Sequence, residues 1–237
     1  MTGGLRQLGA LVAALALAAG CDRLPGKPTR REEYRLPSQV ADFASLYGTN
    51  CSGCHGADGR LGPARPLNDP LYLALASDAE LRQVIGRGVP GTTMPAFAVS
   101  AGGTLTDEQI AALVGEMRAR WAQPATVASV SLPPYSAPLG DAARGADAYA
   151  AYCASCHGAD GSGGSARGSI VDASYLALVS DQGLRSTVIA GRTDLGMPDF
   201  RGAKAATPMT AQQVADVVAW LAAKRAAFPG QPFPRSN

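Results

Sequence analysis

The sequence predicts an all-α protein built from two copies of one small helical domain. The first observation is an internal repeat, in which short segments between residues 47 and 97 recur 102 or 103 residues further along the chain. The second is a helical pattern near the end of each copy, where apolar residues follow the spacing i, i+3, i+4 and i+7. No hairpin or βαβ pattern competes with these helices.

The repeat extends through most of each copy. Tyr47 and Tyr149 each lie four residues before the pattern Cys-x-x-Cys-His-Gly-Ala-Asp-Gly. Residues 69–78 read Asp-x-x-Tyr-Leu-Ala-Leu-x-Ser-Asp, and residues 172–181 repeat this pattern. Because the copies stay in register from the first motif to the last helix, the match exceeds what chance produces.

Segments of different composition separate the copies. Residues 122–138 contain four Pro and no charged residue, which predicts a semi-extended, Pro-rich linker. We therefore place domain one at residues 39–121 and domain two at residues 139–225. A C-terminal tail that again contains Pro follows at residues 226–237.

Three segments have the form of a capping box, Ser/Thr-x-x-Glu/Gln, which marks the first turn of a helix. They begin at Ser77, Thr106 and Thr210. The latter two precede apolar residues at helical spacing, so each copy is expected to end in an amphipathic helix. The apolar positions are Ile110, Leu113, Val114 and Met117 in the first copy and Val214, Val217, Val218 and Leu221 in the second.

Residues 1–20 have the anatomy of a secretory signal peptide, with one positive charge, an apolar stretch and a small-residue end. The apolar stretch is shorter than the roughly 20 residues of a membrane-spanning helix. Leu17-Ala-Ala-Gly-Cys21 resembles the lipobox of bacterial lipoproteins, in which the signal is removed before a cysteine that becomes diacylated. An ordinary cleaved signal that leaves Cys21 unmodified is the alternative.

Residues 21–38 are charged, contain Pro and lack apolar periodicity, so they are expected to form a lipid-anchored tether. Asp22 resembles the residue that retains lipoproteins in the inner membrane of enteric bacteria. The sequence thus predicts a protein held on the extracytoplasmic, periplasmic face of the bacterial inner membrane, with lipidated Cys21 as its anchor.

The chain has five Cys and two His, and six of these seven residues form two identical Cys-x-x-Cys-His motifs. This pattern is the attachment site of c-type haem: two thiols bond to the vinyl groups of one haem, and the adjacent imidazole binds the iron. We therefore expect two covalently bound haem c groups. A zinc site would need ligands from both copies to converge, and a thioredoxin-like site would leave the His without a role. The motif residues are Cys51, Cys54 and His55 in the first copy and Cys153, Cys156 and His157 in the second.

The sixth iron ligand follows by elimination. Both His are used and no motif Cys is free, so Met remains. Met94 and Met197 lie 39 and 40 residues after their His, and each precedes Pro, so we predict that they bind iron. Met117 and Met209 instead occupy positions where the other copy has Leu, which indicates structural roles.

Both copies resemble class I cytochrome c domains in the Tyr-x-x-x-Cys-x-x-Cys-His-Gly pattern, the Met-Pro loop and the C-terminal amphipathic helix. Dihaem relatives such as the cytochrome c4 group share the tandem plan. The resemblance implies a small helical fold wrapped around each haem, with the first and last helices crossing and only a haem edge exposed. The copies differ where Pro66 is replaced by Ser169 in a longer Gly- and Ser-rich loop, so we expect His157 to be supported differently and the haems to be inequivalent.

Two filled irons predict a single-electron carrier and not an enzyme. A dihaem peroxidase or thiosulfate dehydrogenase would need an open iron or another His or Cys ligand. The runner-up function is gas binding or sensing, which would need Met197 to dissociate from the iron. The chain has a formal net charge of +2 and no basic run mixed with aromatic residues, which excludes nucleic acid as a partner. No small-molecule substrate is expected. The expected partners are redox proteins of respiratory or photosynthetic chains, including a complex in which the chain is a subunit.

Overall fold

The computed structural model describes residues 34–164, 167–202 and 207–226. It contains two compact units, Met1–Gln39 and Val40–Asn237. The described part of the first unit holds a short 3-10 helix, Pro37–Gln39, in which the Leu36 amide donates a hydrogen bond to the Gln39 side chain. The predicted signal peptide and Cys21 lie outside the described residues. No helix in the described ranges has the length and apolar character needed to span a bilayer.

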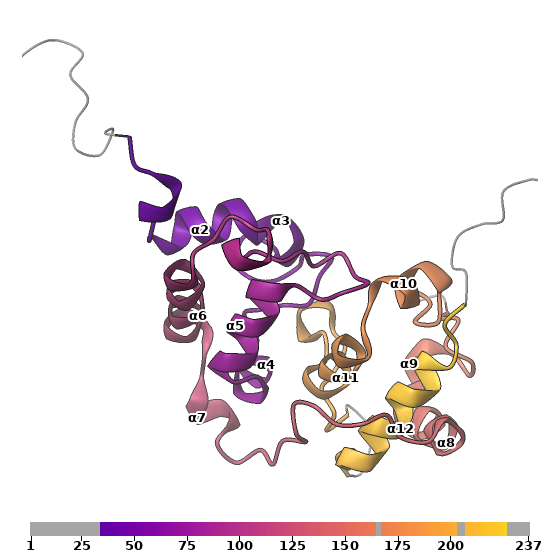
Figure 1. Ribbon diagram of the computed structural model, residues 1–237. Coiled ribbons are helices and arrows are strands. Elements are labelled where there is room, and N and C mark those ends of the chain that lie inside the picture. The colour runs from indigo at the N-terminus through magenta and orange to yellow at the C-terminus, as the bar shows by residue number, and fades with distance from the viewer. Residues whose placement is uncertain (1–33, 165–166, 203–206, 227–237) are drawn as a thin grey trace, which may run out of the picture. The chain divides into compact units, whose positions relative to one another are not determined.

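The second unit contains both copies, and its described residues form helices, loops and isolated β-bridges, with no named strand (Figure 1). The order of elements is the same in the two copies, as the repeat predicted, and the all-α prediction is confirmed. Copy one contains α2 (Phe43–Asn50), α3 (Ser52–His55), α4 (Pro70–Leu75), α5 (Asp78–Arg87) and α6 (Asp107–Trp121). Copy two contains α8 (Ala142–Tyr152), α9 (Ala154–His157), α10 (Ala173–Leu178), α11 (Asp181–Ala190) and α12 (Ala211–Ala222), and α7 (Pro124–Val127) lies between the copies.

The helix starts agree with the capping boxes that the sequence predicted. Ser77, Thr106 and Thr210 each accept a hydrogen bond from the backbone three residues later, and the Glu or Gln at that position reaches back to the cap. Each reciprocal pair satisfies backbone amides that the first turn of a helix leaves without a partner. Helices α5, α6 and α12 therefore begin where local sequence dictates.

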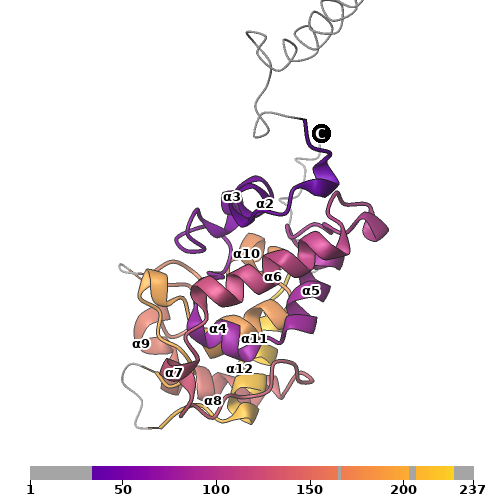
Figure 2. The same cartoon turned by 90° about the vertical axis from the view of Figure 1, so that its left-hand side faces the viewer.

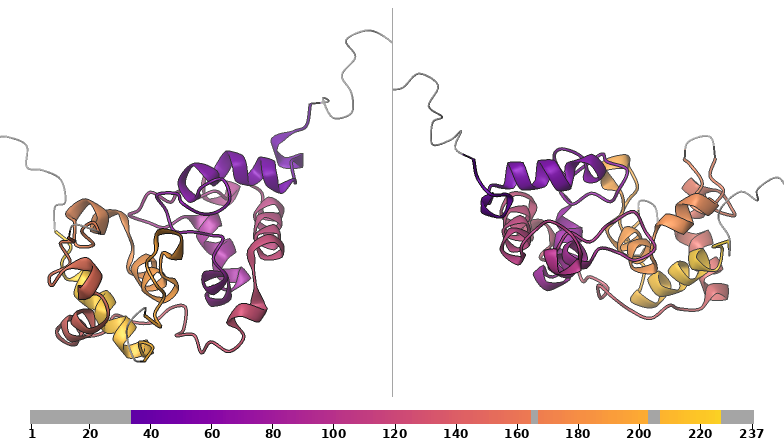
Figure 3. Two further views of the ribbon diagram at one scale, coloured as in Figure 1. Left: turned by 180° about the vertical axis from the view of Figure 1, so that it is seen from behind. Right: turned by 45° about the horizontal axis from the view of Figure 1, so that its top comes forward.

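The first and last helices of each copy cross beside the haem motif, but the crossings are built differently. In copy two, α8 packs closely on α12 because Gly145 has no side chain; a Cβ there would lie 2.1 Å from the carbonyl oxygen of Asp216 (Figure 3). Tyr149 and Trp220 stack beside it with ring centroids 4.1 Å apart. In copy one the equivalent of Gly145 is Phe43, whose ring fills the crossing instead.

That crossing is an aromatic cluster. Phe43 stacks on Tyr47 at 5.2 Å and meets Trp121 edge-on at 5.5 Å between centroids. Arg120 lies over the Phe43 ring at 4.8 Å. The two copies thus reach the same crossing with a glycine contact in one case and with aromatic packing in the other.

The copies share part of their hydrophobic core. Helix α4 of copy one lies beside α11 of copy two (Figures 1 and 2). One continuous buried cluster includes Leu73 from α4, Val114 from α6, Leu184 from α11 and Val217 from α12. A smaller cluster around Leu46 belongs to copy one alone.

The linker is fixed to copy two along its second half. The buried Arg185 donates hydrogen bonds to the carbonyl oxygens of Pro134 and Tyr135, and Gln182 donates to Tyr135 at 2.7 Å. Both side chains lie on α11, so the same helix that contacts α4 also holds the linker.

Candidate haem sites

Each Cys-x-x-Cys-His motif forms one helical turn directly after a longer helix. Cys51 ends α2 and caps α3, with φ −121° and ψ −38°, so the chain changes direction at the first thiol. Cys54 and His55 then follow on α3. Cys153 has nearly the same backbone, φ −120° and ψ −35°, between α8 and α9. The four thiols of the two motifs form no disulfides.

The repeated Tyr of each copy fixes this turn. The Tyr47 hydroxyl donates a hydrogen bond to the Gly56 carbonyl at 2.8 Å, and Tyr149 donates to Gly158 at 2.5 Å. Gly56 has φ +83°, and a Cβ on it would lie 1.7 Å from the carbonyl oxygen of Arg60. Glycine is therefore required directly after the His, which accounts for the Tyr and the Gly of the repeated pattern.

The imidazole of His55 is held in one orientation. The residue is 8% exposed, and Nδ1 lies 2.8 Å from the carbonyl oxygen of Arg65, which makes Nδ1 the protonated donor. Nε2 is then the nitrogen available to a metal. Burial lowers the pKa of His55, the charges of Arg65 and Arg192 lower it further, and the Arg65 carbonyl opposes them. The ring is consequently neutral near pH 7, as a metal ligand must be.

His157 has the same position in copy two but different support. Its Nδ1 is buried and has no hydrogen-bond partner. Burial lowers the pKa of His157 and the charge of Arg167 lowers it further, while the Gly168 backbone opposes them. The two histidines therefore differ in the way that the replacement of Pro66 by Ser169 suggested.

Met94 and Met197 lie in loops of similar design. Each loop starts at a glycine with positive φ, Gly88 at +67° and Gly191 at +76°, where a Cβ would lie 2.6 Å from the backbone of the loop's Met-Pro segment. The Val89 amide donates to the Met94 carbonyl at 3.0 Å, which closes the first loop. Both Met are partly exposed, whereas Met117 and Met209 are 2% and 5% exposed in the core. The sequence shows that both Met-Pro loops contain Gly, but not that Gly88 and Gly191 start the loops with positive φ.

These residues fit haem c. Each copy combines two free thiols and one His on a single turn, and a partly exposed thioether lies in a separate loop. Burial raises the pKa of Cys51 to about 11 and that of Cys153 to about 11, and the second thiol of each motif adds to the effect. A redox-active Cys-x-x-Cys needs a lowered pKa, so this finding opposes the thioredoxin-like alternative. Within the described ranges no three His, Cys, Asp or Glu side chains gather as a zinc site requires.

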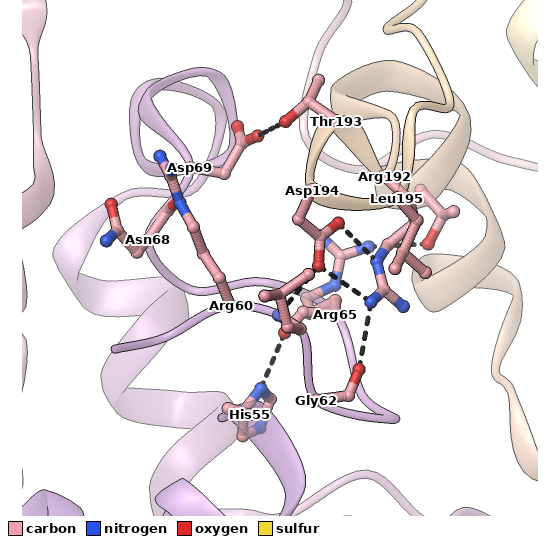
Figure 4. Close-up of polar contacts among 12 residues, drawn as sticks. His55, Arg60, Gly62, Arg65, Asn68, Asp69, Arg192, Thr193, Asp194 and Leu195 are labelled. Atoms are coloured by element: carbon pink, nitrogen blue, oxygen red, sulfur yellow. Dashed lines mark hydrogen bonds and ion pairs between the residues drawn. The ribbon is translucent and has the colours of Figure 1, made fainter. Parts of the chain in front are cut away.

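The loop after His55 contacts the Met197 loop of copy two (Figure 4). The Leu61 amide donates to Asp194 at 3.0 Å, and Arg192 donates to the Gly62 carbonyl at 3.0 Å. Arg192 also pairs with Asp194, whose side chain is 2% exposed, and lowers the pKa of that carboxyl. The Arg192 backbone in turn exchanges two hydrogen bonds with Met197. No feature of the sequence had pointed to this contact.

Comparison with known proteins finds the same two segments. The chain matches the family described as cytochrome c oxidase, cbb3-type, subunit III over residues 38–115 and 140–221. A stretch of 70 residues is 43% identical to dihydro-heme d1 dehydrogenase of Pseudomonas aeruginosa, which is 30% of this chain and 13% of that protein. This chain therefore spans only a small part of that relative. The reducing HAO-like protein complex of Kuenenia stuttgartiensis is similar with a TM-score of 0.46 and 17% identity, over 81% of this chain and 100% of that one.

The two family matches cover most of both copies and more than half of the whole chain. They confirm the predicted tandem of helical cytochrome c domains, a type of domain that holds haem c covalently through a Cys-x-x-Cys-His motif. The chain thus belongs to the cbb3-type cytochrome c oxidase subunit III family, and its cytochrome c domains make it an electron carrier.

Proposed function

We propose that this protein is a membrane-anchored dihaem cytochrome that passes single electrons between extracytoplasmic redox partners. The observation that carries the proposal is the doubled haem motif. Each copy presents two thiols and a neutral imidazole on one Tyr-supported turn, together with a Met in a glycine-started loop.

Haem c bound at these motifs supplies a one-electron Fe(III)/Fe(II) couple. The residues of the chain hold and orient it: Cys51 and Cys54, or Cys153 and Cys156, attach the macrocycle, while His55 and His157 face the iron. Met94 and Met197 are the proposed sixth ligands, because a thioether favours the ferrous state and raises the reduction potential. With six ligands per iron, the protein exchanges electrons without binding a substrate.

The proposed partners are redox proteins, and the family points to a terminal oxidase as the electron acceptor. The donor on this scheme is a respiratory or photosynthetic redox protein. Lipidation at Cys21 would keep the domains beside such a membrane complex, with residues 21–38 as the tether. On this proposal, Cys21→Ser moves the protein from the detergent-extracted membrane fraction to the soluble fraction or leaves the signal uncleaved. A mature N-terminus that mass spectrometry shows to be unmodified would contradict it.

Haem counting and carbon monoxide binding test the central proposal. The pyridine haemochrome spectrum and intact mass should show two covalent haem c groups, and Cys51→Ala or Cys153→Ala should each impair the attachment of one haem while largely sparing the other. The reduced protein should bind carbon monoxide poorly, because both sixth positions are filled. Removal of all haem by acid acetone would sink the proposal. Ready carbon monoxide binding by one unmodified haem would favour gas binding or catalysis at that copy.

A further inference from the structure

Copy two holds the loop that follows His55 at several points between residues 61 and 69 (Figure 4). Asp194 accepts from the Leu61 amide at 3.0 Å, and Thr193 donates to the Asp69 carboxylate at 3.1 Å. Asp69 is buried and also caps α4 through its other oxygen, which accepts from the Tyr72 amide at 2.8 Å. The loop is therefore fixed at both ends by the partner copy.

Arg65 lies between these ends and makes contacts in two directions. Its carbonyl oxygen lies 2.8 Å from Nδ1 of His55. Its guanidinium donates to Thr187 Oγ1 at 2.9 Å and to the Gly183 carbonyl at 3.2 Å, both on α11 of copy two. The guanidinium also lies 4.3 Å above the Tyr72 ring. One residue thus connects the imidazole of copy one with a helix of copy two.

Copy two has no such residue at its own histidine. Gly168 occupies the position 103 residues after Arg65 and has no side chain. Its backbone interacts with the His157 ring, but Nδ1 of His157 has no hydrogen bond of ordinary geometry. The hydrogen bond to Nδ1 is therefore present in the copy whose loop is anchored across the interface, and it is missing in the copy that has glycine there.

We propose that Arg65 is a positioning residue through which copy two sets the orientation of the His55 imidazole and the reduction potential of the first haem. The inference rests on the proposed function, in which His55 binds the haem iron. A hydrogen bond from Nδ1 makes the imidazole a stronger electron donor, which stabilises ferric iron and lowers the potential. Loosening the Arg65 anchor should weaken that bond and raise the potential of this haem.

A simple charge effect of Arg65 has the opposite sign. A positive charge near a haem favours the ferrous state, so removing it lowers the potential. Variants that keep the charge but disturb the anchor therefore separate the two roles. Arg65→Lys keeps the charge but has a shorter side chain and loses the planar guanidinium that lies over the Tyr72 ring. Thr187→Val keeps shape and charge but removes one acceptor. Arg60→Gln is the matched control: Arg60 lies in the same loop and donates to the Asn68 carbonyl of its own copy at 2.8 Å.

The experiment is a spectroelectrochemical titration of the full dihaem protein, in which Met94→Ala assigns the wave of the first haem. Arg65→Lys should shift that wave to higher potential, and Thr187→Val should shift it in the same direction by less. Thr187→Ser should restore the wild-type value, and Arg60→Gln should lower it. The wave of the second haem should stay in place in the Arg65→Lys and Thr187 variants.

An unchanged or lower potential of the first haem in Arg65→Lys would overturn the proposal. So would a shift in Arg65→Lys without any shift in Thr187→Val, because the shorter of the two hydrogen bonds from Arg65 to α11 would then not contribute to the anchor. Failure of the proposed function would look different: the wild-type protein would lack two covalent haems or would bind carbon monoxide readily. The two failures can therefore be told apart.

Discussion

Met94 and Met197 differ from the other two described Met in where they lie. The former are partly exposed in loops that start at Gly88 and Gly191, whereas Met117 and Met209 are buried in the apolar core. A buried Met fills space, whereas a partly exposed Met in a Met-Pro loop has a thioether that is free to bind a metal. The environment of each residue thus agrees with the role that elimination gave it, and iron binding stays a prediction.

Replacement of these two Met tests that prediction. Met94→Ala and Met197→Ala should each remove part of the weak charge-transfer absorbance at the red end of the ferric spectrum, which marks His/Met haem. Each should also lower the potential of its own haem, because the ligand that prefers ferrous iron is lost. Met117→Leu and Met209→Leu are the controls and should leave the spectrum unchanged at a cost below about 1.5 kcal/mol. Loss of the band in a control would show that the ligand assignment is wrong.

Asp216 is a buried carboxylate that ties α12 to α8. It accepts two hydrogen bonds from Arg144, each at 3.0 Å, and one each from the Asp141 amide and the Gln212 side chain. Although burial opposes ionisation, the Arg144 hydrogen bonds dominate and lower the pKa of Asp216 to about 2 from its ordinary value of 3.8. The carboxylate therefore stabilises the folded state above its unfolded pKa, and this contribution is lost as the pH falls through the folded pKa.

Asp216→Asn should accordingly destabilise the protein near neutral pH by about 1 kcal/mol, a modest value because Arg144 is 60% exposed and solvent screens the pair. Denaturant unfolding measured from pH 7 to pH 2 should show the difference from wild type shrinking between about pH 4 and pH 2. Asp147→Asn removes an exposed carboxylate from α8, the helix that carries Arg144, and serves as the control. A difference independent of pH would show that the charge of Asp216 contributes nothing.

The sequence was sufficient to predict which side chains form the candidate sites, but not which backbone groups support them. The Cys-x-x-Cys-His motifs, the paired Tyr and the Met-Pro loops all carry repeated side chains that a pattern reveals. The hydrogen bond from Nδ1 of His55 is accepted by the backbone carbonyl of Arg65. Because every residue has a carbonyl, no residue type in the sequence could have indicated this acceptor. Only the replacement of Pro66 by Ser169 hinted that the two histidines would differ.

The contact between α8 and α12 depends on a single glycine. A Cβ on Gly145 would lie 2.1 Å from the Asp216 carbonyl oxygen. With any other residue at this position, α8 could not approach α12 as closely as it does. Gly145→Ala should push the helices apart and destabilise copy two. The expected cost is about 1–3 kcal/mol or more, since one extra carbon in a packed core typically costs that much.

Gly115→Ala on α6 is the matched control for that substitution. A Cβ there meets no atom within 4 Å, so the helix propensity of Ala should leave stability unchanged or raise it by up to about 1 kcal/mol. Denaturant unfolding monitored by circular dichroism measures both. Equal stability of the two variants would show that the α8–α12 crossing is looser than the contact distance requires.

Local sequence was sufficient to predict several helix starts, but some contacts between helices could not be predicted from the repeat. Arg118 of α6 donates to Leu73, Ala76 and Asp78, and so joins the end of α4 to the start of α5. In copy two, Arg225 makes the equivalent contacts with Leu176, Val179 and Asp181 from beyond the end of α12. The two arginines do not align in the repeat, since Arg118 corresponds to position 222. Pattern matching therefore misses an interaction that both copies have.

At the scale of the whole molecule, the continuous cluster that contains Leu73 and Leu184 couples the stability of the copies. Leu184→Ala in copy two should cost about 2–5 kcal/mol and shift a single calorimetric transition of the protein to lower temperature. Two separate transitions, of which only one moved, would mean that the copies unfold independently. A surface substitution on α5, Arg82→Ala, is the control and should leave the transition in place.

The two copies could be recognised from the sequence because repetition is a one-dimensional signal. How they meet could not, since the polar contacts at Asp194 and Thr187 use residue types that are common on any surface. The domain limits 39–121 and 139–225, the cytochrome c4-like plan and the lipidation of Cys21 stay predictions.

The contact between the copies is heterologous in the sense used for oligomers. Copy one contributes the loop after its His, and copy two contributes α11 and the loop before its Met. No hydrogen bond between described residues joins the reverse pair, residues 161–172 of copy two with residues 80–91 of copy one. A two-fold axis would place both histidine loops in the same surroundings, and a heterologous contact cannot. The surroundings of His55 and His157 would therefore differ even if the two copies had identical sequences.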